Sequence, residues 1–123
     1  MSGQNGAYKV ALTAATSTAV GGVLKLLNPE GANLIITKLV LDITTESTGA
    51  ASVDAGTDDA GDASSDNLID GKSVAAAGVF DNGANSGTNG GSAKWAAGEY
   101  LVITASATTA GMVGNAYIEW IRE

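Results

Sequence analysis

The residues of this chain best suited to chemistry are the aspartates of the glycine-rich segment 47–71. They are Asp54, Asp58, Asp59, Asp62, Asp66 and Asp70. Calcium prefers hard oxygen ligands of this kind, but an EF-hand loop needs acidic groups at alternate positions followed by glycine, and this spacing differs. The segment therefore predicts a solvated acidic loop, and specific calcium binding stays open as an alternative.

The spacing of these aspartates also indicates how the backbone folds. Five of them recur at every fourth position, so on a helix they would form one stripe of like charge in which each pair is destabilising. Gly56 and Gly61 lower the helix propensity further. We expect a loop with a short extended piece at 51–55, held at its end by Leu68 and Ile69.

Other catalytic side chains are scarce. The sequence has no His and no Cys, which removes the commonest general base and all thiolate chemistry. Paired carboxylates can hydrolyse glycosides, but that chemistry also needs a substrate cleft. The run GTNGG at 87–91 is not followed by the GK[ST] of a phosphate-binding loop. We predict that the chain is not an enzyme, with no catalytic residues, no cofactor and no metal.

Two tryptophans are the largest side chains, and they have different expected positions. Trp120 lies on strand periodicity and is expected in the core. Trp95 follows a glycine-rich stretch and is expected to be half exposed. There it could stack on a sugar ring, as in a carbohydrate-binding module, or lie at the sandwich edge or a subunit interface, where Trp is enriched.

The charge of the chain excludes two classes of partner. The net charge is −7, from 13 acidic and 6 basic residues, with no cluster of Lys or Arg. Such a surface repels phosphate backbones and anionic lipids, so we expect no nucleic acid and no membrane as partners. No run of about 20 apolar residues is present to span a membrane.

The long aliphatic stretch 33–45 predicts the central strand. With strict alternation, one face carries Ile35, Leu39, Leu41 and Ile43 and belongs to the core. The other face starts apolar with Leu34, Ile36 and Val40 and then becomes polar. A strand of this kind is typical of a sheet whose second face is covered over part of its length, and we expect a subunit contact to cover it.

Alternating patterns and turn signals recur along the rest of the chain. Residues 99–107 and 113–121 predict a closing hairpin, shorter strands are expected at 8–12, 23–27 and 74–80, and 81–92 is a second long loop. Residues 1–6 are expected to form a flexible arm. The chain of 123 residues therefore predicts one all-β domain, 1–123, an antiparallel β-sandwich of jelly-roll type with long Gly/Asp-rich loops.

Several segments resemble a known family. They are LNPEGANLIITKLVLDITTESTGAASVDAG, SSDNLIDG, GVFDNGANSGTNGG, KWAAGEYLVITAS and AGMVGNAYIEWI, which together span most of residues 27–121. In these segments the sequence resembles head decoration (cement) proteins of tailed bacteriophages and prophages. The resemblance implies a virion structural protein on the outer surface of the capsid.

The resemblance also implies partners and contact residues. It implies a homotrimer that binds the major capsid protein across capsomer boundaries and stabilises the head. The expected subunit or capsid interface comprises Leu34, Ile36, Val40, Trp95, Asp58 and Asp62. A head-fibre or tail-associated structural protein and a lectin-like carbohydrate-binding module remain alternatives.

Overall fold

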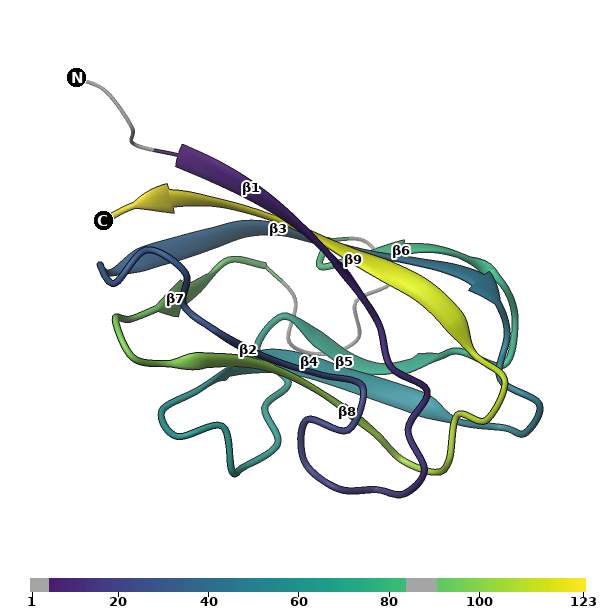
Figure 1. Ribbon diagram of the computed structural model, residues 1–123. Helices are drawn as coiled ribbons and strands as arrows, with labels where there is room; N and C mark the ends of the chain where they lie inside the picture. The colour runs from purple at the N-terminus through teal and green to yellow at the C-terminus, as the bar shows by residue number, and fades with distance from the viewer. Residues whose placement is uncertain (1–4, 84–90) are drawn as a thin grey trace.

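Two antiparallel β-sheets stacked face to face form the molecule (Figure 1). The computed structural model describes residues 5–83 and 91–123. The strands in these residues are β1 (Asn5–Ala11), β2 (Leu24–Leu27), β3 (Leu34–Thr45), β4 (Ser52–Asp58), β5 (Ile69–Ser73), β6 (Gly78–Asp81), β7 (Ala93–Trp95), β8 (Tyr100–Ala105) and β9 (Val113–Arg122). This part of the chain contains no helix, and so none that could cross a membrane. The predicted all-β antiparallel sandwich is confirmed.

The strand order is nested. One sheet has the order β1-β9-β3-β6, with β7 also paired to β3, and the other has the order β2-β8-β4-β5. Apart from β7, the first strand therefore pairs with the last, the second with the next to last, and so on inward. A long antiparallel hairpin rolled into two sheets takes this order, and the jelly-roll type stays a prediction from the sequence.

The core lies between the two sheets and is mostly aliphatic. Its largest fully buried side chains are Trp95, Leu34, Ile36, Leu39, Leu41, Ile43, Leu68, Ile69, Leu101, Ile103, Ile118 and Val23. Trp95 and Trp120 meet edge to face, with ring centroids 6.1 Å apart and an interplanar angle of 81°. Residues at every second position of β8 and β9 supply the core, as their alternation predicted. The closing hairpin predicted from these two segments is wrong, because β8 pairs with β2 and β4 in one sheet and β9 with β1 and β3 in the other.

A β-bulge in β3 changes which side chains face the core. The pairing of β3 with β9 shifts between Ile36 and Lys38, so Thr37 is the extra residue. Leu34 and Ile36 before the bulge are fully buried, together with the predicted core residues after it. The predicted second-face positions of Leu34 and Ile36 are therefore wrong, because an extra residue reverses the alternation. Ile35, predicted in the core, is half-buried on the opposite face.

The start of the chain is more ordered than the predicted arm. Strand β1 begins at Asn5 and pairs with β9, so Asn5 and Gly6 belong to a strand. Gly6 lies against the indole of Trp120, where an added Cβ would approach within 2.7 Å of the ring. Glycine thus allows the strand to cross the tryptophan. Residues 1–4 of the arm lie outside the described residues.

Two other segments differ from their expected lengths. The extended piece expected at 51–55 is the longer β4, and the strand expected at 74–80 is replaced by β5 and β6 on either side of an irregular turn. Leu68 and Ile69 are fully buried, as predicted. Of the second long loop, 81–92, residues 84–90 lie outside the described residues.

Candidate interaction surfaces

The acidic segment after β4 folds back over the outside of the four-stranded sheet. Gly56 faces outward from β4, and a Cβ there would collide with the Ser65 and Asn67 side chains and come within 2.9 Å of the Asn67 nitrogen. Its neighbour on β8, Val102, also points away from the core, yet is fully buried. We call residues 59–67 the covering loop, because they enclose this outer side.

Aspartate and asparagine side chains hold the covering loop in place. Asp58 Oδ2 accepts hydrogen bonds from the backbone N–H groups of Gly61 at 2.9 Å, Asp62 at 3.1 Å and Ala63 at 3.3 Å. Asn67 Oδ1 accepts a bond from the Thr57 N–H at 3.1 Å. The carboxylate of Asp58 thus stabilises a turn, whereas Asp62 is exposed to solvent. The loop therefore lies along the sheet.

The carboxylates of this region do not gather around a common point. In residues 5–83 and 91–123, no three acidic side chains lie where they could hold a metal ion. Asp54 accepts a bond from the Gly71 N–H at 2.7 Å and so joins β4 to β5. The hydrogen bonds of Asp54 and Asp58 are therefore bonds to the chain's own backbone.

One close pair of carboxyl groups joins Glu99 to Asp59, the first residue of the covering loop. The Ala96 N–H donates to Glu99 Oε1 at 2.7 Å, and this bond lowers the pKa of Glu99. The hydrogen bond with Asp59, burial and the negative charges of Asp59 and Asp58 outweigh it, so the pKa of Glu99 is raised overall. Asp59 is exposed, which makes the pair part of an acidic surface.

The predicted aromatic contact residue lies inside the molecule. Trp95 is 0% exposed, and its Nε1–H donates to the Glu99 carbonyl at 3.1 Å. A side chain without exposed surface cannot stack on a sugar or touch another subunit, so the half-exposed position expected for Trp95 is wrong. The glycine-rich stretch before it made exposure the natural prediction, but β7 pairs with the start of β3 and directs the indole inward.

The outer side of the five-stranded sheet has no covering segment among the described residues. We define the outer face by the outward residues of β3, β6 and β9: Ile35, Lys38, Val40, Asp42, Val79, Asp81, Val113, Asn115, Tyr117, Glu119 and Ile121. Val79 is 68% exposed and Val113 55%, and Tyr117 and Ile121 are also exposed. Val40 lies here, half-buried beside Tyr117.

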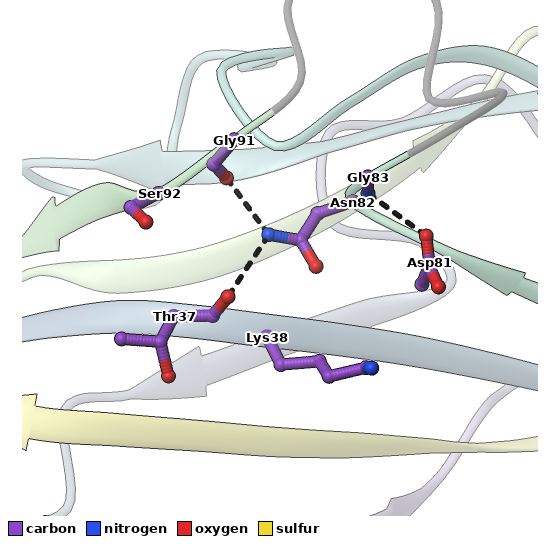
Figure 2. A pocket seen from close by; sticks show the side chains of 7 residues that line it. All are labelled: Thr37, Lys38, Asp81, Asn82, Gly83, Gly91 and Ser92. Atoms are coloured by element: carbon purple, nitrogen blue, oxygen red, sulfur yellow. Dashed lines mark hydrogen bonds between the residues drawn. The ribbon is translucent and has the colours of Figure 1, made fainter.

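A shallow hollow of about 260 Å³ lies where β3 loses its neighbours, between β6 and β7 (Figure 2). The Asn82 side chain bridges this gap. Its Nδ2 donates to the carbonyls of Thr37 at 3.3 Å and Gly91 at 2.8 Å, and its Oδ1 accepts from the Leu39 N–H at 2.9 Å. No buried side-chain nitrogen or oxygen of the described residues lacks a partner. The Asn82 side chain therefore makes hydrogen bonds to β3 of the kind that a neighbouring strand would make. Among the described residues, the hollow contains no buried, unpartnered polar atom that could bind a ligand.

Most residues of the outer face, and the hydrogen-bonding role of Asn82, were not predicted from the sequence. The alternation of Tyr117 and Glu119 with core residues in β9 was a signal for the outer face. For Asn82 the only signal was the Asn-Gly turn pair, which indicates a turn and gives no hint of a bond to a strand 43 residues away.

Comparison with known proteins shows a fold likeness only. The sequence matches no protein-family model, and it has no match among curated proteins. A chain in the capsid of Ralstonia phage GP4 has a similar structure, with a TM-score of 0.59 and 14% sequence identity over 100% of this chain and 87% of that chain. At that identity the likeness establishes a shared fold.

Two further solved structures were found with lower scores. A chain in the acidic stable capsid of Helicobacter pylori bacteriophage KHP30 has a TM-score of 0.48 and 15% identity, and covers 96% of this chain and 91% of that one. A chain in the capsid asymmetric unit of cyanophage Pam1 has a TM-score of 0.45 and 10% identity over 100% and 89% of the two chains.

Proposed function

We propose that this chain is a structural protein of a tailed-phage virion, a decoration or cement protein on the outer surface of the capsid. It binds the major capsid protein across capsomer boundaries as a homotrimer. The observation that carries the proposal is the fold likeness to a chain in the capsid of Ralstonia phage GP4, which extends over the whole of this chain. The resemblance of residues 27–121 to decoration proteins points to the same role.

The surfaces of the molecule support a binding role. The acidic side is closed by its own covering loop, and the opposite side presents an open sheet face with apolar side chains. A protein that binds the assembled lattice more tightly than free subunits stabilises the shell by mass action. Such a role needs complementary surfaces and no catalytic group.

The predicted contact residues divide into two groups. Leu34, Ile36 and Trp95 are part of the core and leave the proposed interface. Val40 on the outer face and Asp62 on the covering loop stay in it, since both lie at the surface. Asp58 contributes through the loop that its carboxylate holds in shape.

The carbohydrate-binding alternative loses its main support with the burial of Trp95. The exposed tyrosines do not replace it, since Tyr8 and Tyr117 point to opposite sides of the five-stranded sheet. Lys9 also lies over the Tyr117 ring, 5.6 Å from its centroid. A head-fibre or tail location is a possible result of the experiment below.

Cryo-electron microscopy of the parent virion tests the proposal. We expect density for this chain on the outside of the head at boundaries between capsomers. Particles that lack the protein should regain it on addition of the purified chain, and their heat resistance should rise. Density in a tail or fibre would assign it there, and absence from the virion would refute the structural role.

A further inference from the structure

The Asn-Gly pair Asn82–Gly83 lies beside the bulge in β3, and pairs of this type are prone to deamidation. The backbone nitrogen of the residue after an asparagine can attack the side-chain carbonyl carbon, and a glycine there has no Cβ to hinder the approach. Asparagine is for this reason a thermolabile residue. The sequence also contains Asn-Gly at 5–6 and 89–90. We call the hydrogen bonds that the Asn82 side chain makes to β3 and to Gly91 the Asn82 bridge.

The folded chain restrains both reacting groups of this pair. Asn82 is only 5% exposed, and its Nδ2, the leaving group, donates to two backbone carbonyls (Figure 2). The attacking nitrogen, that of Gly83, donates its N–H to Asp81 Oδ1 at 2.8 Å. A carboxylate at this distance also disfavours loss of the amide proton, because the nitrogen would become negative beside a negative charge. The fold therefore opposes the reaction at the nucleophile and at the leaving group.

Deamidation of this pair would destroy the Asn82 bridge. The Gly83 nitrogen forms a bond to Cγ of Asn82, the Cγ–Nδ2 bond breaks, and Nδ2 leaves with the Gly83 proton as ammonia. Water, the only co-reactant, then opens the succinimide ring at one of its C–N bonds and leaves aspartate or isoaspartate. Both products lack the donors to the Thr37 and Gly91 carbonyls. Isoaspartate also adds a carbon to the main chain directly after β6.

We propose that Asn82 is a site of spontaneous modification that the fold keeps unreactive and the unfolded chain exposes. Each period of unfolding converts a share of the chains to aspartate or isoaspartate at this position. These chains cannot rebuild the Asn82 bridge, so the loss of stability is permanent and grows with the time spent unfolded. The inference is independent of the virion role, because it concerns hydrogen bonds inside one molecule.

A comparison of folded and unfolded protein measures the protection. The purified chain is held in mildly alkaline buffer with and without urea, and peptides that contain Asn5 or Asn82 are quantified by mass spectrometry. An isoaspartate methyltransferase assay detects the second product. In urea the two asparagines should react at similar rates, because neither has a fixed structure around it. Without urea, Asn82 should react about tenfold more slowly or less than that, because the Asn82 bridge has to open first.

Two variants separate Asn82 from the other Asn-Gly pairs. Gly83→Ala adds a Cβ that hinders the attack. The folded chain can accommodate this Cβ, because it would meet only the Asp81 carboxyl group, at 3.2 Å from Oδ1, and the φ of Gly83 lies outside the left-handed region. The matched control, Asn5→Gln with Asn89→Gln, keeps Asn82–Gly83 and removes the other two pairs, because glutamine would have to close a larger and less favourable ring.

Refolding after increasing times in urea tests the consequence. The share of wild-type and control chains that regains the native urea midpoint should fall in step with modification of Asn82, whereas Gly83→Ala should keep a larger native share. If Gly83→Ala does not fold, the wild type alone decides: modified Asn82 should be enriched among the chains that a protease cleaves after refolding.

Several results would overturn the proposal. They are equal deamidation rates of Asn82 with and without urea, a loss of refolding that the control variant prevents, and equal amounts of modified Asn82 in cleaved and resistant chains. Each of these measurements is made on the purified chain, so none of them depends on the capsid.

Discussion

Replacement of Asn82 by alanine should destabilise the fold, because this side chain takes the place of a strand beside the bulge in β3. The change removes the acceptor of the Leu39 N–H and the donor to the carbonyls of Thr37 and Gly91. Leu39 is fully buried, so water cannot replace the lost acceptor. An unsatisfied buried group costs about 1–3 kcal/mol, and each further bond about 1 kcal/mol net.

We therefore expect Asn82→Ala to lower the free energy of unfolding by about 3–5 kcal/mol, a large share of the roughly 5–15 kcal/mol of a typical domain. Asn82→Asp keeps the acceptor for Leu39 but loses both donations and places a negative charge beside two carbonyl oxygens. Near neutral pH, Asn82→Asp should lower the free energy of unfolding at least as much as Asn82→Ala does. Because Asp has nearly the volume of Asn, a large loss for Asn82→Asp indicates that the side chain acts through its hydrogen bonds, and a small loss would indicate that it acts by packing.

Urea unfolding followed by tryptophan fluorescence measures these costs at one fixed protein concentration, because association also stabilises the folded chain. Asn115→Ala is the matched control: Asn115 is a half-buried asparagine of the outer face with no side-chain bond to the described residues, and its loss should cost less than about 0.5 kcal/mol. An Asn82→Ala variant as stable as this control would refute the role given to the side chain.

Three further changes test the covering loop and its surroundings. Gly56→Ala should push the covering loop from the sheet, lower the free energy of unfolding by about 1–3 kcal/mol and speed proteolytic cleavage within 59–67. The control Gly49→Ala should change neither the stability nor the cleavage rate, because a Cβ at Gly49 would meet no other atom within 4 Å. The raised pKa of Glu99 means that the folded state holds this proton more tightly than the unfolded chain, so stability is lost as pH rises above the ordinary value of 4.5. Glu99→Gln should remove that part of the pH dependence in unfolding titrations, and an unchanged profile would contradict the shift. Trp95→Phe should lower the urea midpoint, because it removes the bond to the Glu99 carbonyl and weakens the contact with Trp120, and an unchanged midpoint would contradict the interior position.

The fold class followed from local patterns, because alternation and turn residues act over a few positions. The long strand, the two last strands and the absence of a helix in 47–71 all came from such patterns. The pairing of the two last strands into a closing hairpin did not hold, because partners are chosen by packing between distant segments. Contacts between distant segments could not be read in this way. The covering loop depends on Gly56 being free of a side chain at the place where Ser65 and Asn67 arrive, and nothing in the spacing of the aspartates indicates that approach.

The site residues were harder to predict than the fold for a similar reason. Composition correctly placed the acidic residues at the surface, but it could not show that Asp58 binds three backbone N–H groups of its own loop. Trp95 was assigned from the glycines before it, whereas its position follows from pairing with Leu34 across the sheet. Of the six predicted contact residues, Leu34, Ile36 and Trp95 are buried, whereas Val40, Asp58 and Asp62 keep side chains at the surface.

The bulge at Thr37 connects the stability of the molecule with its surface. Strict alternation would expose Leu34 and Ile36 and bury only Ile35, whereas the bulge buries the pair and leaves one isoleucine half-exposed. Full burial of such a side chain stabilises the fold by about 1.5–3 kcal/mol. The bulge interrupts the hydrogen bonds between strands, but Asn82 accepts the bond of the Leu39 N–H there. The gain from one more buried side chain therefore outweighs the cost of the bulge. The same extra residue removes two apolar side chains from the outer face and aligns Lys38 with Glu119 on it. The outer face therefore combines apolar and charged groups, which suits a specific contact with another subunit better than a purely aliphatic strip would.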